Sequence, residues 1–116
     1  MKTFILISFL SISIQAEVLN EEKYTVTAYC SCEKCCGKWS KYNKTANGQT
    51  PKQGVTCAAS RKIPFGTRLN IQGVGVRIVQ DRLAKKYDNR IDIYFSNHND
   101  ALKFGKKELK VFIDKK

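Results

Sequence analysis

The sequence is poor in histidine, tryptophan, proline and acidic residues, on which common sites and architectures depend. Its 116 residues include one histidine, one tryptophan and two prolines, and 10 acidic residues stand against 21 basic ones. A second sizeable domain is excluded, because domains usually need on the order of 100 residues. The sequence has no repeat, no low-complexity tract and no apolar run longer than residues 4–14. A helix of about eleven residues crosses only about half of a hydrocarbon core of about 30 Å, so this run predicts no membrane span.

The composition that remains is that of one small globular domain with excess positive charge. A hydrophobic content of 42% with 10% aromatic residues can build a core, which the composition of disordered chains cannot. The net charge of +11 favours anionic partners, such as nucleic acids, acidic glycopolymers or anionic membranes. The lysines are scattered, however, and no helix-turn-helix, zinc-finger spacing or aromatic RNA-binding signature is present. We therefore expect no nucleic-acid partner.

Residues 1–16 have the pattern of a secretory signal peptide. Lys2 precedes the apolar run, and the small residue Ala16 stands just before a cleavage point at Glu17. A retained membrane anchor is the alternative, but the run is short for that role. We expect residues 17–116 to form the mature protein, secreted or periplasmic, with no stable membrane insertion after cleavage.

Five cysteines in an exported chain predict disulfide bonds, which offset the limited core of a small domain. The candidates for pairing are Cys30, Cys32, Cys35, Cys36 and Cys57. One must stay unpaired in a monomer, and the sequence does not choose among the pairings. A zinc site of thiolates is the rival interpretation, but the adjacent cysteines are awkward for one tetrahedron. A nucleophilic cysteine would need His98 as its base, and we interpret His98 instead as a polar residue in the first turn of a helix.

Alternating apolar and polar residues of β-rich composition predict short, half-buried strands. These strands are residues 24–29, 68–71, 76–79, 90–95 and 109–113. One helix is expected over residues 97–104, with Ser96 or Asn97 as its N-cap and Gly105 at its end. Residues 34–52 are the longest stretch expected to be irregular. Many short strands with little helix favour a small closed barrel, because closure removes the exposed edges of a sheet.

Two aspartates stand where strands disfavour them. In residues 90–95 the period of two places the isoleucines on one face and Asp92 on the other. Asp81 ends the run of residues 76–80 beside an irregular loop, which is a common place for chemistry. The structural alternative is an ion pair of Asp92 with Arg90 or Arg82 on a solvated face. The pattern alone does not choose between catalysis and the ion pair.

An ordered series of short motifs resembles one known family. The motifs are VTAYC (26–30), TANG (45–48), IPFGTRLNIQGVG (63–75), Asp81, RIDIYF (90–95) and ALKFG (101–105). Together they resemble the 3D domain, which is named for three aspartates, and the match runs from about residue 24 to residue 113. The resemblance implies an all-β fold over residues 17–116, a small six-stranded double-psi β-barrel with one short helix near the C-terminus. Such barrels are related to lytic transglycosylase A and to stationary-phase muralytic enzymes.

The resemblance also implies a function at the bacterial cell wall. Such domains act on peptidoglycan and cut the glycan between N-acetylmuramic acid and N-acetylglucosamine, leaving a 1,6-anhydro end. The family's catalytic acid corresponds to Asp92, and Asp81 is the second residue assigned to catalysis because it would position or tune that acid. Thr45, Gly48 and Tyr29 are the implied substrate-binding residues. The expected form is a monomer on peptidoglycan glycan strands, associated with the cell wall, without metal or organic cofactor.

The chain departs from the family pattern in two places. Residues 57–60 read Cys-Ala-Ala-Ser where the family has its first aspartate, and residues 82–84 read Arg-Leu-Ala where it has Thr-Gly-Gly. The lost glycines are those that let a backbone approach a sugar. A non-catalytic barrel that binds cell-wall saccharide is therefore the alternative function. An exported, zinc-bearing anion binder is a third.

Overall fold

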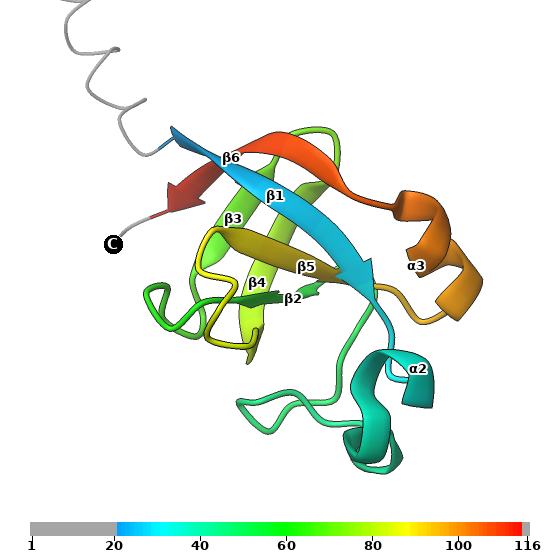
Figure 1. Cartoon of the computed structure of the whole chain (residues 1–116). Helices are drawn as coiled ribbons and strands as arrows, with labels where there is room; N and C mark the ends of the chain where they lie inside the picture. Colours follow the sequence, from blue (N-terminus) through cyan, green and yellow to red (C-terminus); the bar gives the residue numbers. More distant parts are fainter. Residues whose placement is uncertain (1–20, 115–116) are drawn as a thin grey trace, which may run out of the picture.

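The computed structural model describes residues 21–114, without the side chain of Trp39. The expected signal peptide, residues 1–16, lies outside the described residues. The elements in chain order (Figure 1) are β1 (Glu21–Tyr29), α2 (Glu33–Cys36), the 3-10 helix η1 (Gly37–Tyr42), β2 (Thr56–Ala59), β3 (Arg68–Ile71), β4 (Gly75–Arg82), β5 (Arg90–Tyr94), α3 (His98–Phe104) and β6 (Lys107–Asp114).

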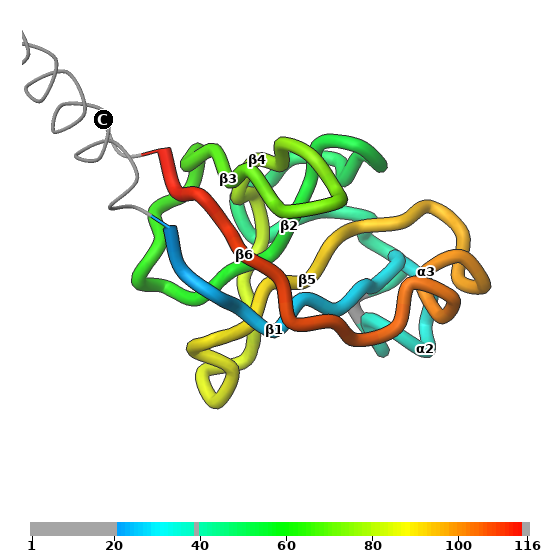
Figure 2. Tube along the Cα trace, turned by 90° about the horizontal axis from the view of Figure 1, so that it is seen from above, coloured from blue at the N-terminus to red at the C-terminus, as the bar shows by residue number. Residues whose placement is uncertain are grey.

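The six strands close into a barrel in the order β1-β5-β2-β4-β3-β6. β1 pairs in parallel with β5, and β2 in parallel with β4, whereas the other neighbouring strands are antiparallel. Figure 2, which views the barrel from above, shows α2 and α3 on the same side of it. The structure confirms the expected all-β, six-stranded barrel with a short helix near the C-terminus.

Alternation along the strands fills the barrel interior and leaves polar residues outside. Ile91 and Ile93 of β5 are fully buried in the core, as are Val26 of β1 and Leu69 of β3. Successive side chains of a strand point to opposite faces, so Asp92 lies on the outer face of β5. The packing that builds the core therefore also presents Asp92 outside it.

Two segments differ from what the sequence predicts. All four residues of β2 are buried, and a strand covered on both faces lacks the alternation on which strand prediction depends. The stretch 34–52, expected to be irregular, contains most of α2 and all of η1. Gly37 follows the last residue of α2, and its φ of 58° is a left-handed value that glycine adopts without strain.

The predicted helix near the C-terminus is confirmed as α3 and begins one residue later than expected. Asn97 is its N-cap, and its side chain accepts a hydrogen bond from the backbone N–H of Asp100 at 3.1 Å. Gly105, with a φ of 74°, follows its last turn. His98 is the first residue of this helix. Within residues 21–114 the structure has no helix with the length and apolar character of a membrane span.

Candidate functional site

A groove of about 660 Å³ opens on the outer face of the barrel. Four of the five residues predicted for catalysis or substrate binding line this groove: Asp92, Asp81, Tyr29 and Thr45. A second hollow, of about 720 Å³, has Tyr24 and Phe65 in its lining and contains none of the five. We therefore take the first groove as the candidate site, because the chemistry lies there and size alone does not distinguish the two.

The floor of the groove is a row of residues from neighbouring strands. Asp92 of β5 is the register partner of Thr27 on β1 and of Ala58 on β2. Ala58 is in turn the register partner of Asp81 on β4. Register partners point to the same face of a sheet, so the two aspartates lie on one surface with the small Ala58 side chain between them. Ala58, whose side chain is a single methyl group, lines the groove between them.

A bulge in β4 is the reason that Asp81 belongs to this row. The pairing of β2 with β4 moves from Cys57 opposite Val79 to Ala58 opposite Asp81, so Gln80 is an extra residue. Val79 is buried in the core, and in a regular strand Asp81, two residues further on, would share its face. The bulge instead turns Asp81 to the groove, as bulges beside functional sites commonly do.

Asp92 is held from one side. Its Oδ1 accepts a hydrogen bond from the Thr27 hydroxyl and lies 3.4 Å from Nε of Arg90. Arg90 Nε also donates to the Thr27 Oγ1 at 2.9 Å. Among residues 21–114, no hydrogen bond reaches Oδ2 of Asp92, and the side chain keeps 20% of its surface exposed in the groove. One carboxyl oxygen is thus fixed while the other is available to a bound molecule.

The surroundings of Asp92 favour its protonated form. Burial, which penalises the charged carboxylate, is the largest effect and raises the pKa of Asp92 above its ordinary value. The charge and hydrogen bond of Arg90 act in the opposite direction, and the negative charge of Asp81 adds to the increase. The net direction is upward, which is what a general acid needs near neutral pH.

Both carboxyl oxygens of Asp81 accept hydrogen bonds. Its Oδ2 accepts from the Tyr29 hydroxyl at 2.8 Å, and its Oδ1 accepts from the backbone N–H groups of Ala46 at 3.0 Å and Arg82 at 2.9 Å. Burial and the neighbouring Asp81 charge raise the pKa of Tyr29, so Tyr29 stays a hydrogen-bond donor. Asp81 therefore fastens one wall of the groove, whereas Asp92 retains a free oxygen.

The wall that Asp81 fastens is a tight turn near Thr45. Thr45 is buried, and its Oγ1 donates to Asn47 Oδ1 at 2.5 Å and accepts from the backbone N–H of Gln49 at 3.0 Å. Gly48 donates its N–H to the carbonyl of Thr45 at 2.9 Å and has a φ of 86°. Gly48 forms this turn and does not itself line the groove. A contact of either residue with substrate stays a prediction.

Cationic and aromatic side chains complete the groove. Lys44, Arg82 and Arg90 line it together with the ring of Tyr87. The guanidinium of Arg90 stacks over the Tyr87 ring at 4.3 Å, and that of Arg82 lies over Phe65 at 3.9 Å. These contacts hold both arginines at the groove, where positive charge attracts anionic groups and an aromatic face can pack against a sugar ring.

The structure does not support the predicted disulfides. All five cysteines are free, and the nearest measured pair, the sulfurs of Cys30 and Cys32, is 2.9 Å apart, well beyond a disulfide bond of about 2.05 Å. Cys57 is packed in the barrel core, where burial raises its pKa to about 12. The fold therefore removes it from the reach of a partner thiol. Burial likewise raises the pKa of Cys30 to about 12, while the hydrogen bond from Cys30 lowers that of Cys32 to about 6.

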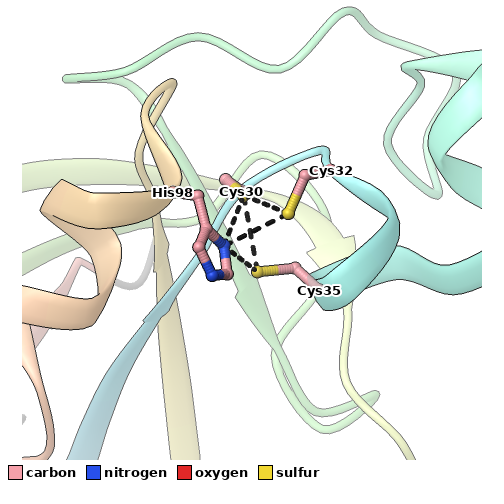
Figure 3. Close-up of side chains that lie close together, drawn as sticks. All are labelled: Cys30, Cys32, Cys35 and His98. Atoms are coloured by element: carbon pink, nitrogen blue, oxygen red, sulfur yellow. Dashed lines mark hydrogen bonds between the residues drawn. The ribbon is translucent and has the colours of Figure 1, made fainter.

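His98 was the residue whose surroundings the sequence did not predict. Its Nδ1 faces three sulfurs, those of Cys30, Cys32 and Cys35 (Figure 3). The interpretation of His98 as a polar residue in the first turn of a helix gives its position correctly and misses these neighbours. Three closely spaced cysteines and a single histidine in one chain were the available signal. The groove residues Arg82, Tyr87 and Ala58 carried no comparable signal, because each depends on strand register or loop path.

Comparison with known proteins gives a partial match. No family model matches this chain. Over 92 residues the chain is 30% identical to the cell wall shaping protein YabE of Bacillus subtilis (strain 168), whose name marks that role as provisional. The aligned part is 75% of this chain and 21% of YabE. The chain thus spans about a fifth of the length of this relative.

Proposed function

We propose that this protein acts outside the cytoplasm on the bacterial cell wall, where it binds peptidoglycan and cleaves its glycan strands as a lytic transglycosylase. Three observations support the proposal. The chain is similar to part of a protein named for cell wall shaping. It folds as a closed six-stranded barrel. The barrel carries an open groove with a carboxyl group whose pKa is raised.

One carboxyl group suffices for this reaction. Hydrolysis of a glycoside usually needs two, because one protonates the leaving oxygen while the other activates water or forms a covalent intermediate. In a lytic transglycosylase the attacking group is the substrate's own 6-hydroxyl, already tethered to the ring, so the entropy of bringing the reactants together is small. A mechanism with one carboxyl group fits this groove, because the second carboxyl group, that of Asp81, already accepts three hydrogen bonds.

Asp92 performs both proton transfers. Its neutral carboxyl donates a proton to the glycosidic oxygen as the bond from that oxygen to the muramic acid carbon breaks. The resulting carboxylate then takes the proton of the 6-hydroxyl while the oxygen of that hydroxyl bonds to the same muramic acid carbon. This step closes the 1,6-anhydro ring and restores the acid. Oδ2 suits this work because Thr27 and Arg90 hold only Oδ1. Arg90 would stabilise the transient carboxylate between the two steps.

The proposal rests mainly on the position of Asp92, which is partly buried on the floor of an open groove with one oxygen free. The test is to incubate the purified protein, and in parallel its Asp92→Asn variant, with peptidoglycan and to search for soluble anhydro-muropeptides by mass spectrometry. We expect release by the natural protein and none by the variant. Absence of anhydro products from both would refute the enzymatic part of the proposal.

A non-catalytic saccharide-binding barrel is the second candidate. The observation that favours it is the ion pair of Asp92 with Arg90, because a positive charge 3.4 Å from the carboxylate stabilises its ionised form. In that case Asp92→Asn would leave wall association unchanged and no muropeptide would appear. Under both candidate functions we propose that the protein is secreted after removal of a leader and that it is a monomer.

A further inference from the structure

Four potential metal ligands converge at one end of the barrel, and the proposed function uses none of them. The sulfurs of Cys30, Cys32 and Cys35 and a ring nitrogen of His98 all lie within 4.8 Å of one another. Nδ1 of His98 is 3.4 Å from Cys30 Sγ, 3.2 Å from Cys32 Sγ and 3.5 Å from Cys35 Sγ. Figure 3 shows the four donor atoms pointing toward one another.

These distances fit a tetrahedral metal better than a disulfide. Bonds of about 2.3 Å to sulfur and about 2.0 Å to nitrogen around one zinc ion place neighbouring donors about 3.5–3.8 Å apart. The three nitrogen–sulfur separations, 3.2–3.5 Å, are within a few tenths of an ångström of that range. The sulfur pairs at 2.9 Å and 3.4 Å would need to spread by less than 1 Å. A disulfide would leave the third sulfur and the histidine without a role.

The neighbouring cysteine does not compete for the site. Cys36 is not among the four residues whose donor atoms converge, and its thiol donates to the backbone carbonyl of Cys30 at 3.1 Å. Because Cys36 lies outside this donor set, the objection that two adjacent cysteines cannot share one tetrahedron does not apply to Cys35. The donor set is then three cysteines and one histidine, four protein ligands without an open position, as in structural zinc sites.

We propose that Cys30, Cys32, Cys35 and His98 bind one Zn²⁺ ion with a structural role. The ligands come from three separate pieces of the fold: the residues directly after β1, the short α2, and the first turn of α3. Four residues of α2 and six of η1 are too few to be stable helices alone. A zinc ion would fasten this segment to the barrel and to α3.

The site also borders the groove. Cys35 is one of the groove-lining residues, and the chain that follows η1 leads directly to Lys44 and Thr45 in the groove wall. Loss of the metal should therefore loosen this wall while the barrel core, which lies apart from it, stays folded. The metal takes no part in the proton transfers at Asp92.

The first test uses the unaltered protein, purified in air without a metal-affinity tag or added reductant. We expect one zinc per chain by mass spectrometry of the metal, and five thiols that alkylate after denaturation. Replacement by Co²⁺ should give the intense visible spectrum of tetrahedral cobalt with sulfur-to-metal charge transfer. Zinc well below one per chain, or a chain lighter by the hydrogens lost in disulfide formation, would overturn the proposal. These readouts do not depend on peptidoglycan cleavage, so the two proposals can fail separately.

The second test identifies the ligands with a matched control. Cys35→Ser and His98→Ala should each lower the affinity for zinc at least tenfold. Competition with a chromogenic chelator measures that affinity. Cys36→Ser changes the adjacent residue of the same helix and should keep one zinc per chain. Zinc retained at full affinity in Cys35→Ser, or lost equally in Cys36→Ser, would contradict the ligand set. Because the barrel core should survive zinc loss, circular dichroism of each variant checks that the strands remain folded.

Discussion

Asp81 and Asp92 are both register partners of Ala58, one across the parallel pair of β2 with β4 and the other across the antiparallel pair of β2 with β5. The two carboxyl groups therefore share one surface but have different duties. Asp81 accepts hydrogen bonds from three donors through both of its oxygens. Asp92 is held through Oδ1 alone. This asymmetry leads to four predictions about the two carboxyl groups.

Asp92→Asn should abolish cleavage while leaving the fold intact. The amide cannot exchange the proton, and loss of a general acid–base residue costs about 100-fold to 10,000-fold in rate. The amide can still accept from Thr27, so wall binding should persist. Rates are measured from anhydro-muropeptide release with matched protein concentrations. Asp88→Asn, at an exposed aspartate paired with Lys62, is the control and should keep the natural rate; equal losses in both variants would speak against a special role for Asp92.

Tyr29→Phe should destabilise the protein by about 1–2 kcal/mol, because it removes a hydrogen bond to a charged carboxylate. The wall held by Asp81 should loosen as well, and turnover should fall although the acid is untouched. Urea unfolding monitors the free energy of unfolding. Tyr87→Phe is the matched control on the same groove, since no hydrogen bond within residues 21–114 involves its hydroxyl. An unchanged unfolding free energy in Tyr29→Phe would show that Asp81 does not depend on this donor.

Arg90→Gln should move the pH range of cleavage upward. Arg90 opposes the increase in the pKa of Asp92, so its removal raises that pKa further and keeps the acid protonated at higher pH. The loss of activity on the alkaline side should then occur at a higher pH than in the natural protein. Cleavage rates at a series of pH values measure this shift. Arg68→Gln, an exposed arginine on β3, should leave the profile in place. A shift to lower pH in Arg90→Gln would contradict the assignment of Asp92 as the acid.

The raised pKa of Asp92 also predicts how the free energy of unfolding depends on pH. Between the ordinary aspartate pKa of about 3.9 and the raised pKa of Asp92, the folded chain binds more protons at this group than the unfolded chain does. Stability from this group is therefore present at low pH and is lost as pH rises through that window. The difference in unfolding free energy between the natural protein and Asp92→Asn should fall across the window and level off above it. Urea titrations at a series of pH values measure this difference, and a difference that rises with pH would give the opposite sign.

The sequence predicted the parts of the molecule that depend on local patterns. Alternation in residues 90–95 placed Asp92 opposite the buried isoleucines, and capping at Asn97 marked the start of α3. Both follow from backbone geometry within a few residues, so neither needs knowledge of the fold.

The remaining features depend on distant parts of the chain. The parallel pairing of β1 with β5 carries the end of each strand to the same end of the barrel, and this brings His98 to the cysteines that follow β1. The extra residue Gln80, which turns Asp81 to the groove, is visible only in the register of β4 against β2. β2 itself lacks alternation because it is buried throughout. None of these features has a signature within one stretch of sequence.

The central claim is that Asp92 drives an attack by the substrate's own hydroxyl, without water as a reactant. The most direct measurement is digestion of peptidoglycan in water labelled with heavy oxygen, followed by mass spectrometry of the new glycan ends. The account predicts unlabelled 1,6-anhydro ends from the natural protein and no new ends from Asp92→Asn. Labelled reducing ends, or equal release of anhydro ends by Asp92→Asn, would contradict it.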